Sequence, residues 1–504
     1  MNNLHSPVDP AQPVIKVFNP VTGALMAEVP SLDITQARQR LEKVRNAQKT
    51  WGSTSFSTRK ALMLNFAEVL YRRREEVATL LSQETGKTLY EAHIFEVVSL
   101  YRMARYFGRR AGKILKPRTI RLSLFINRRS VIEYKPRGVV LIIAPWNFPV
   151  AIPIGEVIMA LMAGNGVVLK PASLTPLVAL KLKEIFDEAG FDPDLFQVIP
   201  GQGRMASELI GPGVDYVNFT GSTAVGKMVA ARCGEKLIPC SMELGGADPA
   251  IVLPDADLDH AARILTWGSF AASGQICASV ERVYVHQSVY DAFVAKVLAC
   301  TQALRQGDPL SGKELDLGSM IDPGQIPIVE RQIEEARSRG AKILTGGARL
   351  GEGSMFFAPT VITGATDDMA VVREETFGPV MPIMPYRDED EAVARANHSP
   401  YALSAYVFGQ PGHARKVARR LEAGTVSVNS VLMTYGMPET PWGGPKESGV
   451  GRVHGDDGLR HLCEPLHLHY PILPFDLPVE FPYSAKKLSF LWRMTHFFSR
   501  LLRQ

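Results

Sequence analysis

The spacing of apolar residues changes several times along the chain, and each change predicts a different kind of element. Over residues 35–110, apolar residues recur at spacings of three and four with charges between them, which predicts helices. Gly86 suits the end of one such helix. Residues 120–138 alternate apolar and polar positions and end at Pro136–Gly138, which predicts an extended, hairpin-like segment.

From residue 138 onward, short apolar runs alternate with helical stretches. The predicted strands are VVLII, GVVLK, FQVIP and VDYVNFT, and the helices between them include IGEVIMALMAG and VALKLKEIFDEAG. The same alternation resumes after residue 247. The apolar runs there are AIVL, RVYV, AKILTGG, FAPTVI and VMPIMPY, and helices are predicted near 257–272 and 289–305. Strands that are apolar on both faces are expected of parallel sheets covered by helices. We therefore expect two α/β lobes that join near Gly245–Gly246.

The segment after about residue 470 differs from both lobes. PILPFDLPVEFPYS is rich in proline and is expected to lack regular structure, and residues 486–504 predict an amphipathic helix. Its apolar face gathers Phe490, Leu491, Met494, Phe497, Phe498, Leu501 and Leu502. Its polar face gathers Ser489, Arg493, His496, Ser499, Arg500 and Arg503, with Trp492 at the edge. Such a helix is suited to a membrane surface, but it is equally suited to packing on the protein's own body or on a partner subunit.

Composition narrows the class of protein. The chain has 504 residues, 46% hydrophobic and 21% charged, with a net charge of +5, which indicates a globular protein of several domains and does not favour nucleic-acid binding. Five cysteines without a CxxC pair argue against disulfides and zinc, so we expect a reducing, cytoplasmic location and no metal. The first residues do not resemble a signal peptide, and no run of 18 apolar residues predicts a spanning helix.

Cys277 is the cysteine whose neighbours suggest chemistry. It stands in SGQICASVERVYV, and MELGGADP, with Glu243, lies 34 residues earlier. Together with PWNFP, LKPAS, FTGS, EETFGPV and PWGGPKESGVGR, these segments resemble the motifs of the aldehyde dehydrogenase superfamily, in the family's order over residues 15–465. Trp442 departs from that pattern, because phenylalanine or tyrosine is commoner after the first proline of PWGG.

The resemblance implies an α/β fold of the aldehyde dehydrogenase type, with a Rossmann-type cofactor domain, an α/β catalytic domain and a small β oligomerisation element. We expect the cofactor domain at 12–118 and 139–245, and the catalytic domain at 246–440. The oligomerisation element is expected at 119–138 and 441–470, followed by the tail at 471–504. The family also implies a homodimer or homotetramer.

The resemblance assigns three catalytic roles. Cys277 is the nucleophile, which adds to an aldehyde and later carries a thioester. Its thiolate requires either a lowered pKa or a nearby base. Glu243 is the general base that activates water for hydrolysis of the thioester. Asn147 is an oxyanion donor beside the backbone N–H of Cys277.

The usual GxGxxG fingerprint is absent, so the expected cofactor contacts are assigned from the same motifs. Lys170 is expected at the adenosine ribose, Glu375 at the nicotinamide ribose and Phe377 beside it. Gly221, Ser222 and Gly226 are expected to open a helix that receives the pyrophosphate. The remaining expected contacts are Pro145, Trp146, Ser173 and Leu244. Ser173 stands where many NAD-preferring relatives have an acid, so NADP is expected to be accepted beside NAD.

The predicted reaction is oxidation of an aldehyde to a carboxylic acid, and a medium- or long-chain aliphatic substrate is favoured by the tail and the general apolarity. A semialdehyde or an aromatic aldehyde is the alternative substrate. Transfer of the acyl group to coenzyme A, a non-redox thioesterase and a non-catalytic relative are the alternative functions. The tail also resembles that of membrane-associated fatty aldehyde dehydrogenases, where such helices attach to membranes or cover the substrate entrance. The sequence leaves peripheral membrane contact through 486–504 open.

Overall fold

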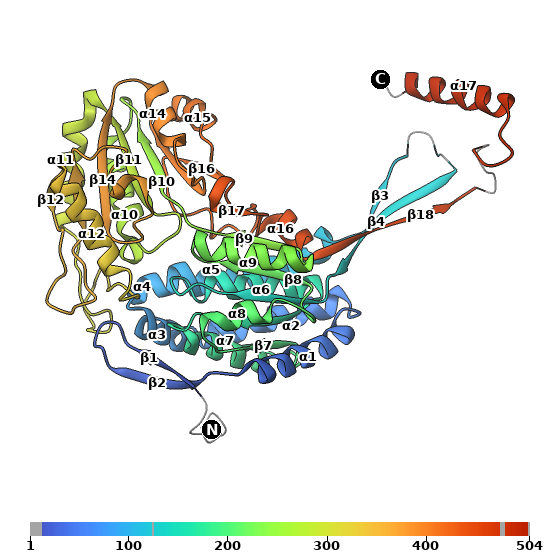
Figure 1. The fold of residues 1–504 in the computed structure, drawn as a ribbon, viewed down its shortest axis with the longest axis horizontal. Coiled ribbons are helices and arrows are strands. Elements are labelled where there is room, and N and C mark those ends of the chain that lie inside the picture. Colours follow the sequence, from blue (N-terminus) through green and yellow to red (C-terminus); the bar gives the residue numbers. More distant parts are fainter. Residues whose placement is uncertain (1–12, 123–124, 126, 474–478, 502–504) are drawn as a thin grey trace.

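Two α/β lobes and a projecting arm make up the fold of the computed structural model (Figure 1). The structure describes residues 13–122, 125, 127–473 and 479–501. Each lobe is built around its own sheet, and the arm is a separate three-stranded sheet. An α/β fold of this kind is what the alternating apolar runs predict. In the described part of the chain, no helix is both long and apolar enough to cross a membrane.

The sheet of the first lobe has six strands in the order β17-β9-β8-β5-β6-β7. Five of them run parallel: β5 (Val139–Ile143), β6 (Gly166–Lys170), β7 (Phe196–Val198), β8 (Tyr216–Thr220) and β9 (Cys240–Glu243). The helices that connect them are α6 (Ala151–Ala163), α7 (Pro176–Glu188), α8 (Gly203–Leu209) and α9 (Thr223–Lys236). The chain runs from β5 to β6 and β7 and then returns to β8 on the other side of β5, which creates a switch point between β5 and β8.

The N-terminal part of the chain adds a hairpin and a set of helices to this lobe. The hairpin is β1 (Val14–Phe18) with β2 (Leu25–Pro30). The helices are α1 (Ile34–Trp51), α2 (Phe56–Arg72), α3 (Arg74–Thr85), α4 (Leu89–Glu91), the π-helix η1 (Ala92–Val97) and α5 (Val98–Ile114). Helices over 35–110 are thus confirmed. Gly86 ends α3 in the left-handed conformation, with φ of 71°, as a glycine after a helix commonly does.

The sheet of the second lobe has seven strands in the order β12-β13-β14-β11-β10-β15-β16, and only β12 is antiparallel to its neighbour. The strands are β10 (Asp248–Val252), β11 (Val280–His286), β12 (Lys342–Thr345), β13 (Thr360–Thr363), β14 (Val380–Tyr386), β15 (Ser404–Phe408) and β16 (Thr425–Val428). The helices are α10 (Leu258–Phe270), η2 (Ala271–Gly274), η3 (Gln287–Val289), α11 (Tyr290–Gln302), α12 (Ile326–Ser338), α13 (Ala370–Arg373), α14 (Glu389–Asn397) and α15 (Pro411–Ala418). Gly245 and Gly246 lie between β9 of one sheet and β10 of the other.

The C-terminal part returns to the first lobe and then builds the arm. The short strand β17 (Gly449–Val450), after η4 (Lys446–Ser448), pairs with β9 and so belongs to the first lobe's sheet. Residues 441–470, which are expected to belong to the oligomerisation element, therefore also contribute a strand to the first lobe. After α16 (Gly455–His461), β18 (Cys463–Pro471) joins β4 (Arg128–Pro136) and β3 (Arg118–Ile120) in the order β18-β4-β3.

The expected hairpin near 120–138 is therefore present as β3 and β4, and it forms the arm that projects from the body (Figure 1). The last helix, α17 (Ala485–Leu501), lies at the outer end of this arm, apart from both lobes (Figure 1). In the tail, none of the side chains described from residue 479 to residue 500 is buried.

Candidate active site

The loop that carries Cys277 has a strained and tightly held backbone. Ala272 and Ser273 of η2 have φ of 50° and 54°, a conformation that such residues keep only when their surroundings enforce it. Glu91 supplies one constraint, because its Oε1 accepts a hydrogen bond from the N–H of Ala272 at 2.6 Å. Gly274 supplies another, since a Cβ there would lie 2.1 Å from the carbonyl oxygen of Gly378. The path of the chain into Cys277 is thus fixed from both lobes.

The connection between the two lobes passes directly behind Cys277. A Cβ on Gly246 would lie 2.3 Å from the carbonyl oxygen of Cys277, so only glycine permits this approach. Glu243, the last residue of β9, precedes this connection and lies near Cys277. Glu243 and Cys277 line one small cavity of about 10 Å³, which is near the minimum space for a single water molecule.

Glu243 is a buried carboxyl group with 6% of its surface exposed, and neither of its oxygens has a hydrogen-bond partner. Burial raises its pKa well above the ordinary value, and the charge of Glu156 raises it further, whereas Arg452 opposes the shift. A carboxyl group with a raised pKa is protonated near neutral pH. It can act as a base there only when its surroundings let it ionise. The charged residues that shift the pKa of Glu243 therefore decide whether it can act as a base.

The Cys277 thiol is not activated by its surroundings alone. Burial raises its pKa, and the charges of Asp248, Glu375 and Glu243 add to the shift. Of the two routes that the sequence leaves open, a lowered pKa or a nearby base, these surroundings do not supply the lowered pKa. Two carboxyl groups share the small cavity with the thiol, and Glu243 is the one whose oxygens have no hydrogen-bond partner.

Asn147 lies between β5 and α6, and its side chain points at the loop that carries Cys277. Its side-chain amide donates a hydrogen bond to the carbonyl oxygen of Gln275 at 2.9 Å, two residues before Cys277. An amide nitrogen has two N–H groups, so one remains for the oxygen of a substrate. Asn147 is 4% exposed, which keeps water from competing for that donor.

A buried ion pair holds Asn147 in place. Lys87 donates to the backbone carbonyl of Asn147 and pairs with Glu96 at 2.6 Å, and both side chains are fully buried. The other oxygen of Glu96 accepts hydrogen bonds from the N–H groups of Val150 and Ala151, at the start of α6, at 2.9 Å each. Lys87 and Glu96 are not predictable as site residues from the sequence, because charges in an amphipathic helical stretch are usually solvated. The one local anomaly is the π-helix η1, a feature often found at functional sites.

The predicted cofactor residues gather at the carboxyl edge of the first sheet. Pro145 and Trp146 follow β5, Lys170 ends β6, and Gly221 follows β8, so they surround the switch point where ligands of such sheets bind. Ser222 is the N-cap of α9, and Ser173 lies just beyond β6, where its hydroxyl donates to Gly201 O at 3.2 Å. Gly226, on α9, packs so closely on Leu244 that a Cβ would come within 2.2 Å of that side chain.

Lys170 is a buried cation for which no acidic partner is seen in the described residues. It is 5% exposed, and burial lowers its pKa to about 8. Buried charges in proteins are normally paired, so this ammonium group suits a ligand that brings hydroxyl or phosphate oxygens. The residues at this edge therefore fit a dinucleotide.

The second lobe closes the other side of this site with Glu375 and Phe377. The Phe377 ring meets that of Trp146 edge-on, with centroids 5.4 Å apart. Glu375 accepts a hydrogen bond from the N–H of Gly246 at 3.0 Å, and burial raises its pKa to about 7. Glu281, which sequence analysis also missed, holds this loop by accepting hydrogen bonds from the N–H groups of Thr376 and Phe377 at 2.9 Å each.

A second, larger cavity of about 170 Å³ also reaches Cys277. Its lining is mostly apolar and aromatic, with one charged residue, Arg102 of α5. The other lining residues are Ile94, Phe95, Val98, Ser99, Phe148, Ile152, Trp267, Ile276, Cys277, Ala278, Leu432, Met433, Tyr435, Gly436 and Trp442. We refer to this cavity as the aldehyde channel. Most of these residues come from helices and loops that carry no motif.

Comparison with known proteins identifies the family to which the chain belongs. Residues 8–467 match the model of the aldehyde dehydrogenase family. A protein of Mycolicibacterium smegmatis is 39% identical over 457 residues, which cover 90% of this chain and 87% of that protein. It carries the provisional name succinate-semialdehyde dehydrogenase [NADP(+)].

Solved structures agree with the sequence comparison. An NADP-dependent enzyme of E. coli is 32% identical, with a TM-score of 0.88 and coverage of 91% of this chain and 95% of that one. An NAD-dependent aldehyde dehydrogenase of Sinorhizobium meliloti is 34% identical, with a TM-score of 0.87 and coverage of 91% and 92%. The chain belongs to the aldehyde dehydrogenase family and is an NAD(P)-dependent oxidoreductase that acts on an aldehyde.

Proposed function

We propose that this enzyme oxidises a short aldehyde that bears a carboxylate at its far end, a semialdehyde, to the corresponding diacid. The observation that carries this proposal is Arg102, the one charged side chain among the residues that line the aldehyde channel. It is exposed and has no ion pair among the described residues. The provisional name of the M. smegmatis relative supports the same substrate class.

The position of Arg102 along α5 suits such a substrate. Phe95 stacks against Trp267 at 5.9 Å and meets Phe148 edge-on at 6.0 Å, which makes an aromatic wall close to the nucleophile's loop. Arg102 lies seven residues further along the same helical face, or roughly 10 Å at the rise of a helix. A guanidinium group at that distance can pair with a carboxylate while the aldehyde end reaches Cys277.

The catalytic roles form part of this proposal. Cys277 adds to the aldehyde carbon, and the amide of Asn147 stabilises the oxygen that becomes negative. NAD(P), when bound, supplies the hydride acceptor. Glu243 then removes a proton from water as that water attacks the thioester, so that a carboxylic acid leaves. Hydrolysis, rather than transfer to coenzyme A, follows from a cavity that contains a base and space for one water.

NADP is proposed as an accepted and favoured cofactor. Ser173 places no carboxylate beside the adenosine ribose, and Lys170 offers a positive charge with no acidic partner in the described structure. A 2′-phosphate would provide that partner. The test is the ratio of kcat/KM values for the two cofactors, and a tenfold preference for NAD would contradict the proposed preference.

Medium- or long-chain aliphatic aldehydes are the second candidate substrates. They are favoured by the apolar lining of the channel, in which aromatic and aliphatic residues outnumber the single charge. An uncharged chain would bind through burial of its methylene groups, each of which contributes about 0.8 kcal/mol. Arg102 would then contribute nothing to binding.

A substrate panel with matched variants separates the two candidates. Succinate semialdehyde, butanal and tetradecanal are compared on the wild type, on Arg102→Ala and on Arg109→Ala, which removes a charge from the same helix outside the channel. We expect the semialdehyde to be preferred over butanal by at least tenfold, and Arg102→Ala to raise its KM by about tenfold or more, because charge-assisted hydrogen bonds are worth about 1.5–3 kcal/mol. Preference for tetradecanal, with no effect of Arg102→Ala, would exclude the semialdehyde.

We further propose that the enzyme is a homodimer or homotetramer joined through the arm. β18 has nine residues and lies at one edge of the three-stranded sheet, and most of its side chains are exposed. Exposed strand edges of this length commonly pair with another chain. Size-exclusion chromatography with light scattering tests this, and a monomer at micromolar concentration would contradict it.

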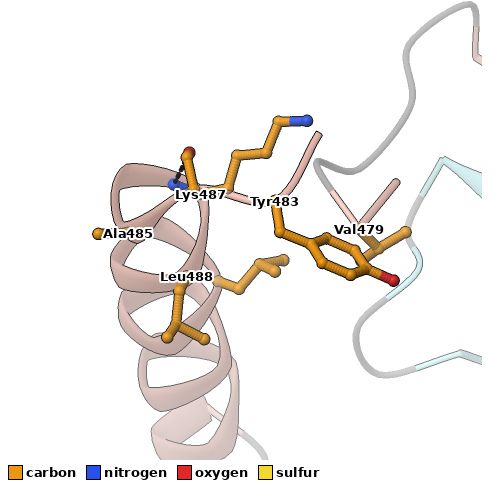
Figure 2. A pocket seen from close by; sticks show the side chains of 7 residues that line it. Val479, Tyr483, Ala485, Lys487 and Leu488 are labelled. Carbon is orange, nitrogen blue, oxygen red and sulfur yellow. Dashed lines mark hydrogen bonds between the residues drawn. The ribbon is translucent and has the colours of Figure 1, made fainter. Parts of the chain in front are cut away.

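The tail helix is proposed to contact membrane surfaces. Figure 2 shows Val479 and Tyr483 close together beside α17, where they line one pocket with Leu488, and these three residues are 50%, 73% and 58% exposed. Trp492 is also exposed, and α17 contains no acidic residue. Deletion of 485–504 should abolish pelleting with anionic vesicles and leave the oxidation of butanal unchanged. Equal pelleting of both proteins would exclude a role in membrane contact.

A further inference from the structure

Glu156 is a buried carboxyl group that none of the motifs includes. It is the one charged residue of α6, a helix in which all 13 residues are buried. Asn218 of β8 donates a hydrogen bond to its Oε2 at 2.5 Å. Glu156 lines the same small cavity as Glu243 and Cys277, so the cavity contains two carboxyl groups beside the nucleophile.

Other buried carboxyl groups in the described structure have an evident structural task, and this pair does not. Glu84 accepts hydrogen bonds from Leu177 and Val178 at the start of α7, at 2.7 and 3.0 Å. Glu96 and Glu281 similarly bind backbone N–H groups. Glu156, by contrast, accepts one side-chain bond and Glu243 accepts none. Ionisation of both groups in one small buried cavity carries a large free-energy cost, because each negative charge disfavours the other.

The surroundings provide little positive charge to offset a second negative one. Burial raises the pKa of Glu156 to about 8, and the charge of Glu156 is the second cause, after burial, of the raised pKa of Glu243. Arg452 acts in the opposite direction on Glu243. The titratable groups that face the pair or its cavity from the packed elements are Cys277, Tyr216, Tyr435, Arg452 and, against Tyr435, His454.

We propose that Glu156 and Glu243 share one proton, and that Glu156 thereby sets the pH range in which Glu243 activates water. The inference rests on the proposed role of Glu243 as the base. In the hydrolytic step, the oxygen of water bonds to the thioester carbon and the carbon–sulfur bond breaks. Glu243 takes the proton from water and passes it to the departing sulfur of Cys277. The step proceeds only from the state in which the negative charge of the pair lies on Glu243. Glu156 is therefore a positioning residue, which acts through Glu243 by influencing which of the two carboxyl groups is ionised.

Hydrolysis of an acetyl group on Cys277 isolates this step from the aldehyde and from the cofactor. The enzyme is acetylated with 4-nitrophenyl acetate, excess reagent is removed by rapid gel filtration, and loss of the acetyl mass is followed by quenched-flow mass spectrometry between pH 5 and 9. Cys277→Ala shows whether the acetyl group resides on Cys277. The measured quantity is the midpoint of the acid limb of the hydrolysis rate.

Glu156→Gln removes the competing charge and keeps the shape of the side chain. We expect the acid limb to move to lower pH by about one unit or more, because Glu243 then ionises without a charged neighbour. One pH unit below the wild-type midpoint, the variant should release acetyl about fivefold faster, and at high pH it should be no faster, since a weaker base removes a proton less readily. A merely structural role would not produce opposite effects at the two ends of the profile.

Asn218→Ala tests the pair without changing either carboxyl group. Asn218 favours the charged form of Glu156, so its loss should leave more of the negative charge on Glu243 and shift the limb in the same direction by a smaller amount. Glu84→Gln is the matched control, because burial raises the pKa of Glu84 to about 8 as well, yet Glu84 does not line this cavity.

The outcomes distinguish the inference from the role on which it rests. If Glu243→Gln hydrolyses acetyl at the wild-type rate, the assignment of the base fails. If Glu243→Gln is blocked while the limbs of Glu156→Gln and Asn218→Ala coincide with that of the wild type, the shared proton is excluded. Should Glu156→Gln fail to fold, the limb of Asn218→Ala alone decides.

Discussion

The two sides from which Cys277 is approached differ in chemistry. On the cofactor side, polar and charged residues stand at the ends of parallel strands, with Lys170 at β6 and Glu375 on the facing loop. On the aldehyde side, the channel is lined by apolar and aromatic residues of helices and loops, with Arg102 as its single charge. The proposed cofactor residues lie in short motifs, whereas the channel is lined by residues scattered along the chain. Most of the residues proposed to select the substrate therefore lie outside the motifs.

Cys277→Ala tests whether the reaction can be abolished at the thiol while the cofactor side still binds its ligand. Activity should fall by at least about 10⁴-fold, since removal of a nucleophile typically costs about 10⁶-fold in rate. Binding of NADPH, followed by its fluorescence, should be unchanged, because the cofactor residues lie on other elements. Cys233→Ala, which changes a buried cysteine of α9, is the control. Loss of NADPH binding in Cys277→Ala would show that the two sides are not separable.

Asn147→Ala should reduce kcat by about 100- to 1,000-fold, the usual effect of losing one oxyanion donor. KM values for the aldehyde and for the cofactor should change little, because the donor acts on charge that develops during the reaction. Steady-state kinetics at 340 nm measure both. A large rise in KM with unchanged kcat would show that Asn147 serves binding instead.

Ser173→Glu should affect the cofactor side alone. A carboxylate beside the adenosine ribose repels a 2′-phosphate, so kcat/KM for NADP should fall by about tenfold or more while that for NAD changes less. The relative rates on succinate semialdehyde, butanal and tetradecanal should stay as in the wild type. Ser173→Ala is the neutral control, and an altered chain-length profile in Ser173→Glu would contradict the separation of the two sides.

The smallest expected effect is a pH dependence of cofactor choice. Burial lowers the pKa of Lys170 to about 8, so the ammonium form is complete below that pH and is lost as the pH rises through it. Affinity for NADP relative to NAD should therefore fall a few-fold between pH 7 and pH 9, less if a bound phosphate raises the pKa again. Fluorescence titration measures both affinities, and Lys170→Met should remove the dependence. A ratio that is constant with pH in the wild type would refute a role for this ammonium group.

The same contrast explains how much could be predicted from the sequence. Cys277, Glu243 and the strand-end residues lie in short contiguous segments, so their neighbours identify them. Strands and helices were also predictable, since each lobe's apolar runs follow the period of its elements. The arm's hairpin followed from plain alternation of apolar and polar residues.

Other residues gave no such signal. Glu156 lies inside an apolar helix, and only the fold shows that it faces Glu243. Lys87 and Glu96 look like ordinary surface charges until helix packing buries them beside Asn147. β17 has two residues, too few for any periodicity, and its pairing with β9 depends on a return of the chain from far along the sequence.

The arm also has a consequence for synthesis on the ribosome. The β18 partner of β4 lies about 330 residues further along the chain, so at roughly 5–20 residues per second β4 waits on the order of 15–65 s for it to be made. β9 similarly waits for β17. During that interval β4 and β9 each present an open strand edge, which can pair with a wrong partner. A chaperone that covers these edges should therefore help the nascent chain to fold. A culture at lower temperature should also yield more soluble enzyme.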